Sequence, residues 1–239
     1  MGLVIKLRNT ILFDLGGTLA HYYDMSDFPS ILKQAIGEVQ LYLDEKGLLT
    51  VTPELIRLRG REENHESADY HSRPLEERLT RIFGLEAPIA TDELLMEMCK
   101  RFMAAIFARG KCYEDTLPAL KELRSRGFRT AIVSNTSWGS PAVSWRSEIK
   151  RLGLDSYMDF VLLDRDIGWR KPSERIFQFA MATLGVLPGD CLFVGDEPKW
   201  DLTGPRSVGM EAILIDRQGT MVGVEEQPIK NLHELTLRL

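Results

Sequence analysis

Short apolar runs recur along the chain, and each is followed directly by Gly, Ser or Asp. Continuous apolar runs of this kind are typical of strands buried on both faces of a parallel sheet. Helical periodicity fills the intervals between the later runs, so strand and helix alternate from about residue 116 onward, which indicates βαβ units with right-handed crossovers. The predicted strands cover 10–13, 130–133, 160–163, 191–194 and 212–215, and the clearest helices between them cover 116–123 and 174–184.

Residues 20–112 show a different pattern. Apolar residues recur there at helical spacing, for example over 28–39 and 94–106, and no strand-like run is followed by a polar turn. The pattern predicts an α/β protein in which a helical insertion separates the first strand from the rest of the sheet. The polar stretch 60–74 fits either a loop or a solvated helix face. Glycine and proline residues divide the insertion into several helices; these are Gly47, Pro53, Gly60, Pro74, Gly84 and Pro88.

The composition is that of an ordinary globular protein, with 44% hydrophobic and 27% charged residues in 239. A net charge of −5 leaves no basic footprint for nucleic acid and no polybasic patch for a membrane surface. No apolar run approaches the roughly 20 residues that span a bilayer. The N-terminal residues do not resemble a signal peptide, and Cys99, Cys112 and Cys191 are far apart. We therefore expect a cytoplasmic protein, a monomer or homodimer, with neither nucleic acid nor membrane as a partner.

The strongest chemical feature follows the first predicted strand. Residues 11–19 read Ile-Leu-Phe-Asp-Leu-Gly-Gly-Thr-Leu, so the strand ends at Asp14 and two glycines let the backbone turn tightly behind it. In open α/β sheets, ligands bind at the carboxyl ends of the strands. An Asp at a strand end is, on its own, more typical of a turn or a helix cap. Three further segments favour the functional interpretation.

The second and third segments bring groups that can hold an anion. Ser134 and Asn135 come just after the strand at 130–133, where a hydroxyl and backbone amides can hold negative charge. Lys171 precedes Pro172 in Gly-Trp-Arg-Lys-Pro. Taken singly, the first segment also fits a Ser-Asn turn, and a lone lysine is usually solvated.

The fourth segment, residues 192–201, reads Leu-Phe-Val-Gly-Asp-Glu-Pro-Lys-Trp-Asp. A predicted strand delivers Asp196 to the same sheet edge, and Glu197 and Asp201 follow closely. Clustered carboxylates without histidine or cysteine are hard oxygen ligands, which indicates Mg²⁺. An acidic helix start would explain Glu197 but not the whole set.

The four segments together, in this order and spacing, resemble the haloacid dehalogenase-like (HAD) hydrolase superfamily, subfamily I with a helical cap. The motifs extend over residues 10–216. The resemblance implies a Rossmann-like three-layer core with a parallel sheet, made of residues 1–19 and 113–239, and an inserted all-helical cap domain of residues 20–112. It also implies the site residues. These are Asp14 and Lys171 as catalytic groups; Ser134, Asn135 and Lys171 at the phosphate; and Asp14, Gly16 (through its carbonyl), Asp196 and Asp201 at Mg²⁺, with Asp201 alternatively holding Lys171 or the metal's waters.

Elementary chemistry supports this assignment. A phosphoryl group is anionic, so a carboxylate nucleophile needs Mg²⁺, Lys171 and backbone amides to reduce charge repulsion. Attack by Asp14 would form an aspartyl-phosphate, which water then hydrolyses, so that one difficult displacement becomes two easier ones. Thr18 is expected to brace the nucleophile loop through its hydroxyl. The expected substrate is a small phosphorylated metabolite.

One position departs from the usual phosphatase pattern. The residue two after the nucleophile is commonly a second Asp that protonates the leaving group, and here it is Gly16. General acid–base help is worth about 10²–10⁴-fold. We therefore expect an enzyme that takes its proton from water or from a cap residue, or one that prefers good leaving groups. The candidate donors follow the nucleophile loop directly; they are His21, Tyr22, Tyr23 and Asp24.

Two alternatives to a phosphatase stay open at this point. A 2-haloacid dehalogenase would use Asp14 to attack carbon, which fits Gly16, but the acidic cluster at 196–201 argues against it because attack on a neutral carbon needs no Mg²⁺. A catalytically inactive, phosphate-binding HAD-like protein would not need the complete set of motifs. Whether the protein is a phosphatase or a dehalogenase, the cap is expected to close over the core, with hinges near residues 18–24 and 110–116.

Overall fold

The computed structural model describes residues 9–63, 68–223 and 227–239. Residues 1–8, which were judged unlike a signal peptide, and residues 64–67 of the polar stretch 60–74 lie outside the described residues. At the centre is a five-stranded parallel sheet of order β5-β4-β1-β6-β7, as the strand pattern predicts. Its strands are β1 (Thr10–Phe13), β4 (Arg129–Ser134), β5 (Phe160–Leu163), β6 (Cys191–Gly195) and β7 (Glu211–Leu214).

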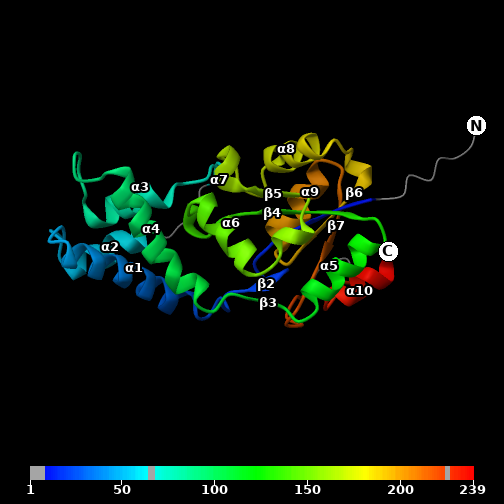
Figure 1. The fold of residues 1–239 in the computed structure, drawn as a ribbon, viewed down its shortest axis with the longest axis horizontal. Coiled ribbons are helices and arrows are strands. Elements are labelled where there is room, and N and C mark those ends of the chain that lie inside the picture. Colours follow the sequence, from blue (N-terminus) through cyan, green and yellow to red (C-terminus); the bar gives the residue numbers. More distant parts are fainter. Residues whose placement is uncertain (1–8, 64–67, 224–226) are drawn as a thin grey trace, which may run out of the picture.

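Both faces of the sheet are buried, so successive residues of a strand enter different hydrophobic clusters. In β1, Ile11 and Phe13 contact one cluster, whereas Leu12 contacts the other. This two-residue alternation between two covered faces explains the continuous apolar runs. Helices α8 and α9 cover one face, and α5 and α10 cover the opposite face (Figure 1). The helices outside the insertion are α5 (Thr116–Ser125), α6 (Ala142–Arg151), α7 (Asp164–Ile167), α8 (Glu174–Leu184), α9 (Thr203–Ser207) and α10 (Leu232–Arg238).

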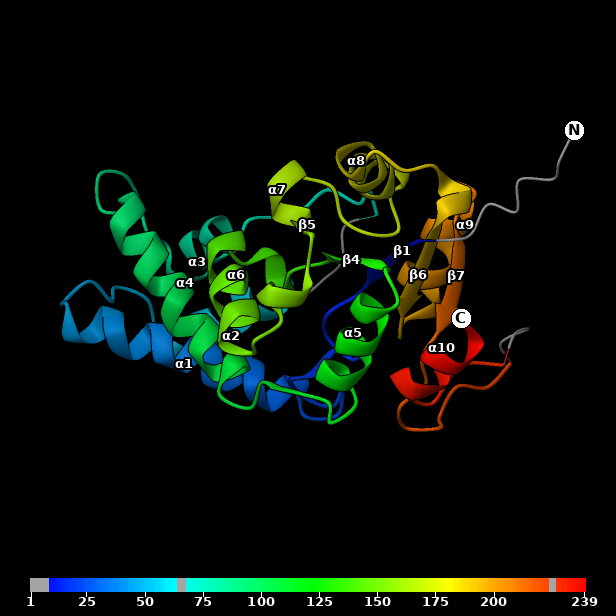
Figure 2. The ribbon, with the colours of Figure 1, turned by 45° about the vertical axis from the view of Figure 1, so that its right-hand side comes forward.

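The described part of the insertion forms four helices. They lie together at one end of the molecule (Figure 2). Helices α1 and α4 pack along one another, and α3 packs on α4. Side-chain caps start two of the helices: Thr52 accepts a hydrogen bond from the amide of Leu55, and Thr91 from that of Leu94. Gly84, with a left-handed φ of 62°, ends α3. The four helices are α1 (Phe28–Glu45), α2 (Pro53–Glu62), α3 (Leu75–Phe83) and α4 (Asp92–Phe107).

Two local features of the insertion differ from the expectations. Its two ends pair as a short antiparallel ribbon, β2 (Ala20–His21) with β3 (Lys111–Cys112), and two-residue strands carry no periodicity that a sequence could reveal. Gly60 does not end a helix but lies buried inside α2, where a Cβ atom would come 3.0 Å from Ile36. The glycine therefore permits close packing of α2 on α1.

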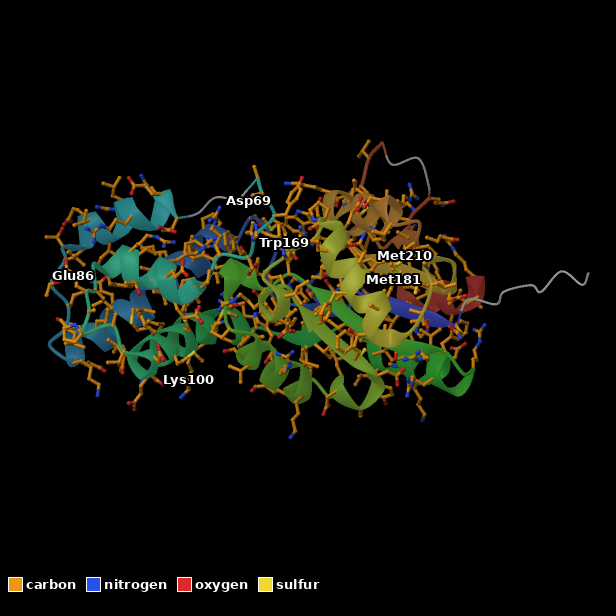
Figure 3. All side chains as sticks on the ribbon, turned by 90° about the horizontal axis from the view of Figure 1, so that it is seen from above. Asp69, Glu86, Lys100, Trp169, Met181 and Met210 are labelled. Atoms are coloured by element: carbon orange, nitrogen blue, oxygen red, sulfur yellow. The ribbon has the colours of Figure 1, made fainter. Side chains whose placement is uncertain are left out.

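Besides the two chain segments that lead into and out of it, the insertion contacts the rest of the molecule through backbone hydrogen bonds. We call residues 70–72 the strap. The amide of Arg170 donates to the carbonyl of Tyr70 (2.9 Å), and the amide of Ser72 donates to that of Gly168 (2.9 Å). Figure 3 shows Asp69, just before the strap, beside Trp169. The polar stretch around residue 70 is thus a loop that docks on the segment leading to Lys171.

The hydrophobic interior is also shared between the insertion and the sheet. One cluster includes Phe13 of strand β1 and Phe102 of α4. The rings of Tyr22, Phe107 and Trp145 contact one another where the two parts meet. Shared burial of this kind couples the two parts energetically. In the described part of the chain, no helix is both long and apolar enough to cross a membrane.

Candidate active site

The four sequence segments meet at the carboxyl edge of the sheet. Asp14 follows β1, Ser134 ends β4, and Asp196 follows β6; these strands are neighbours, with β1 in the centre. The amide of Asp14 donates to the carbonyl of Val194 (2.9 Å), which continues the β1–β6 pairing up to Asp14. Lys171 enters from the loop after α7. The topology therefore brings together side chains up to 182 residues apart in sequence.

Asp14 is held by two donors on the same oxygen. Its Oδ1 accepts hydrogen bonds from the Ser134 hydroxyl (2.8 Å) and from Lys171 Nζ (2.5 Å). Lys171 Nζ also donates to Asp201 Oδ1 (2.6 Å). The lysine and Asp201 are each only 1% exposed, and Asp14 is 8% exposed. Such charge-assisted contacts fix the rotation of the Asp14 carboxylate at the edge of the cavity described below.

Asn135 holds the backbone of Lys171. Its Nδ2 donates to the carbonyl of Lys171 (3.2 Å), and its Oδ1 accepts from the amide of the same residue (2.7 Å). The side chain that the sequence assigns to phosphate is therefore engaged in positioning the lysine. Asp201 likewise holds the ammonium group, which was one of its expected roles.

Two glycines allow the acidic side chains to approach the backbone. Gly17 has a left-handed φ of 78°, and a Cβ there would lie 2.1 Å from Asp196 Oδ2. A Cβ on Gly195 would lie 2.3–2.4 Å from atoms of the Asp201 side chain. Gly16 is different, because its nearest obstacle is the Tyr22 ring at an ordinary 3.7 Å. The backbone therefore requires glycine at 17 and 195 but not at 16.

Negative charge exceeds positive charge in this cluster. Carboxylate oxygens of Asp14, Asp196 and Asp201 all lie within 4.8 Å of one another, and Lys171 is the cation bound among them. Burial and the charges of Asp14 and Asp201 raise the pKa of Asp196 to about 8. Burial by itself would lower the pKa of Lys171, but the two aspartates it contacts raise it overall, so the ammonium stays charged.

The donor set fits a hard divalent cation. Asp14, Asp196 and Asp201 could contribute oxygen ligands, and a divalent cation would offset their excess of negative charge over Lys171. Thr18 donates to Asp196 Oδ1 (3.3 Å). Its hydroxyl thus orients the carboxylate of the fourth segment, across the loop, and braces the nucleophile loop through that contact. Gly16, the fourth expected ligand, lines the adjoining cavity.

A cavity of about 410 Å³ opens beside Asp14. The four candidate proton donors, His21, Tyr22, Tyr23 and Asp24, all line it. Tyr22 is 5% exposed, and its hydroxyl has no hydrogen-bond partner among the described residues. Burial and, next, the nearby Glu148 raise its pKa, so the phenol stays protonated. A larger cavity of about 1480 Å³ lies between α1, α4 and α6, but none of the chemical motifs reaches it.

Arg217 is among the cavity residues that sequence reasoning missed. It follows β7, the last strand of the same sheet edge, which is the signal that could have identified it. Its guanidinium donates to both oxygens of Asp115 (2.8 and 3.0 Å) and twice to the carbonyl of Thr18 (2.6 and 3.1 Å). It also lies 3.8 Å from the ring centroid of Tyr113. Arg217 thus ties the nucleophile loop to the segment that returns from the insertion.

Gly110 lies in the second of the two segments expected to act as hinges, 110–116. A Cβ there would lie 2.6 Å from Glu148 Oε1 and 2.8 Å from the Tyr22 ring, and its carbonyl accepts from Arg151 (2.7 Å). Close packing explains this glycine. The hinges near 18–24 and 110–116 stay a prediction, and the β2–β3 ribbon lies within these two segments.

Comparisons with known proteins agree with the geometry. The sequence model of the haloacid dehalogenase-like hydrolases matches residues 9–209. The chain is 29% identical to a glyceraldehyde 3-phosphate phosphatase of Methanothermobacter thermautotrophicus, over 90% of this chain and 88% of that protein. It is 32% identical to (S)-2-haloacid dehalogenase 4A of Burkholderia cepacia, over 70% and 68%. The crystal structure of a HAD phosphatase from Thermococcus onnurineus superposes with a TM-score of 0.67, at 26% identity, over 96% and 97%.

Proposed function

Since this chain belongs to the haloacid dehalogenase-like hydrolases, we propose that it is a Mg²⁺-dependent phosphatase acting on a small phosphorylated metabolite. One observation carries the choice of reaction. Asp196 places a third carboxylate within 4.8 Å of Asp14 and Asp201, beside a single lysine. This excess of negative charge suits a divalent cation and an anionic phosphoryl group, whereas attack on a neutral carbon needs neither.

The proposed roles follow from the contacts. Asp14 is the nucleophile, and its Oδ1 is held by Ser134 and Lys171. The same two side chains would contact phosphoryl oxygens and reduce the repulsion between two anions. Asn135 and Asp201 keep Lys171 in place from its backbone and its ammonium end. Mg²⁺, held by the three aspartates and the Gly16 carbonyl, would supply electrostatic stabilisation of the phosphoryl group when bound.

The reaction would proceed in two displacements. Asp14 forms a bond to phosphorus while the bond to the leaving oxygen breaks, and water then attacks the aspartyl-phosphate to release inorganic phosphate. Gly16 brings no carboxyl to protonate the leaving oxygen. We therefore propose that water or one of the cavity side chains donates that proton, or that the enzyme favours esters whose leaving groups need none.

We also propose that residues 20–112 act as a cap over the site. The insertion supplies Tyr22, Tyr23 and Asp24 to the cavity that holds Asp14, so it can determine which leaving group enters. Residues 1–19 and 113–239 then form the catalytic core.

The direct test is hydrolysis of 4-nitrophenyl phosphate with Mg²⁺ and after removal of divalent ions by EDTA. We expect activity only with the metal, and a loss of at least about 10³-fold in kcat for Asp14→Asn. Asp27→Asn is the matched control, because Asp27 is an exposed carboxylate outside the cavity. Metal-independent activity, or an unaffected Asp14→Asn variant, would refute the proposal.

A dehalogenase is the second candidate, favoured by Gly16 and by the Burkholderia relative. Chloride release from 2-chloropropionate without added metal would support it. If neither 4-nitrophenyl phosphate hydrolysis nor chloride release is detected, the result would instead indicate a catalytically inactive phosphate-binding protein.

A further inference from the structure

The charged side chains around the cavity affect which leaving group the substrate can carry. Resting on the proposed phosphatase function, we propose that the site selects phosphate monoesters whose leaving group carries no negative charge. Carboxylated or doubly phosphorylated substrates would be disfavoured at this site. The inference follows from how the cations and anions of the cavity wall are distributed.

The cations of the wall are already engaged. Lys171 and Arg217 are the only lysine and arginine among the described residues that line the cavity. Lys171 is bound by Asp14 and Asp201 and faces the phosphoryl position. Arg217 donates four hydrogen bonds, two to the Asp115 carboxylate and two to the Thr18 carbonyl. Neither is placed to pair with a second anion on the substrate.

The remaining wall adds negative charge. Asp24, Glu197 and Asp216 line the cavity beyond the three aspartates at the proposed metal site. Asp24 accepts from the side-chain amide of Gln218 (2.8 Å), a contact that joins the insertion to the loop after β7 across the cavity. An anion on the leaving group would therefore meet like charges in a partly enclosed space, where repulsion is stronger than in bulk water.

Backbone amides of the same wall are also occupied. Asp216 accepts from the amides of Thr220 (3.1 Å) and Met221 (2.9 Å), so the loop after β7 uses these donors internally. Half-buried aromatic side chains of Tyr23, Tyr113 and Trp200 complete the wall. Such a surface favours an uncharged or cationic leaving group with apolar area to bury.

The test compares two esters that differ by one charge, phenyl phosphate and 4-carboxyphenyl phosphate. The carboxylated phenolate is no worse a leaving group, so chemistry alone does not favour the neutral ester. With Mg²⁺ present, we expect kcat/KM to be at least about tenfold higher for phenyl phosphate, because like charges a few ångströms apart repel. The ratio of two substrates in one sample does not depend on the fraction of enzyme that is folded.

A charge ladder at Asp24 assigns the effect to the wall. Asp24→Asn should lower the ratio of kcat/KM for phenyl phosphate to kcat/KM for 4-carboxyphenyl phosphate. Asp24→Lys should lower this ratio further or bring it below one. Asp27→Lys makes the same charge change outside the cavity and should leave the ratio within about twofold of wild type. Raising the salt concentration should weaken the preference in the wild-type enzyme.

The outcomes separate this inference from the function on which it rests. If no aryl phosphate is hydrolysed with Mg²⁺, the phosphatase proposal fails and the inference fails with it. If both esters are hydrolysed and the carboxylated one is equally good, the phosphatase stands and the inference is wrong. An unchanged ratio across the Asp24 ladder would also overturn it.

Discussion

The carboxyl edge of the sheet and the helical insertion are held together in different ways. At the edge, polar side chains are buried and satisfy one another through specific short contacts, as Asp14, Ser134 and Lys171 do. In the insertion, apolar faces of four helices pack together, and ion pairs such as Arg101–Glu97 lie near the surface. Exposed ion pairs contribute only about 0–1 kcal/mol. The edge therefore depends on exact geometry, and the insertion mainly on burial.

The two regions nevertheless share a boundary that has features of both. Buried rings of Tyr22, Phe107 and Trp145 continue the apolar core, while the strap reaches the buried carboxylate of Asp164. Asp164 accepts from the Ser72 hydroxyl (2.7 Å) and from the amide of Thr136 (2.8 Å), which follows Ser134 and Asn135 directly. The insertion is thus fastened to the catalytic edge away from its two ends.

Among substitutions that keep every charged side chain of the site, the largest effect should come from Gly17→Ala, which disturbs the geometry of the sheet edge. The added Cβ would overlap Asp196 Oδ2, at 2.1 Å, so the carboxylate must move. We expect kcat/KM to fall by about 10²-fold or more, the usual result of displacing a catalytic group by an ångström. Steady-state kinetics and thermal unfolding would be measured together.

Gly127→Ala is the matched control for that variant. Gly127 has a similar left-handed φ of 87°, but nothing lies within 4 Å of an added Cβ. It carries the same backbone strain, about 1–2 kcal/mol, without the overlap. Equal losses of activity in the two variants would mean that strain, and not the Asp196 contact, explains Gly17.

Gly16→Asp should instead add a function to the edge. The nearest atom to a Cβ there is 3.7 Å away, so the backbone accepts a side chain at this position. A carboxyl two residues after Asp14 could protonate the leaving oxygen, and we expect hydrolysis of an alkyl phosphate to rise by about 10–100-fold. Hydrolysis of 4-nitrophenyl phosphate should change little, since nitrophenolate leaves without a proton. Equal changes for both esters would contradict this account of Gly16.

Ser72→Ala tests the link between the two regions. Asp164 loses one of its hydrogen bonds, which should cost about 1–3 kcal/mol because the carboxylate is buried. Differential scanning calorimetry should show one transition at a lower temperature, as expected if the shared core unfolds cooperatively. Ser156→Ala removes an exposed hydroxyl and serves as the control. Two separate transitions would show that the insertion and the sheet unfold independently.

The smallest effect concerns the pH dependence of stability. Burial raises the pKa of Asp164, so the folded chain binds more protons than the unfolded chain between the ordinary and the raised pKa. Stability from this group therefore falls as pH rises through that window. Asp164→Asn cannot titrate but keeps an acceptor for the amide of Thr136 and a donor for Ser72. The free energy of unfolding would be measured in urea at pH 4 and pH 8. Relative to wild type, the variant should be more stable at pH 8 than at pH 4. A difference that does not change with pH would contradict the expectation.

Much of the fold could be predicted because the decisive signals are local. Each of the five predicted strands is present within a residue at either end, and α8 covers the predicted 174–184. The strand pattern also placed Asp14, Ser134 and Asp196 at one edge, because parallel strands end on the same side, whereas Lys171 was expected there only from the family resemblance. The ribbon at residues 20–21 and 111–112 escaped prediction because its strands are too short to show a period.

Periodic burial and strand-end chemistry, which the amino-acid order specifies directly, determined the layered architecture and the set of groups at its edge. Tertiary structure alone decided their partners: Asn135 clasps the Lys171 backbone, Arg217 reaches Thr18 across 199 positions, and the strap docks on Asp164. Each contact joins side chains whose separation depends on how completed elements pack, and residue spacing along a chain carries no measure of that distance.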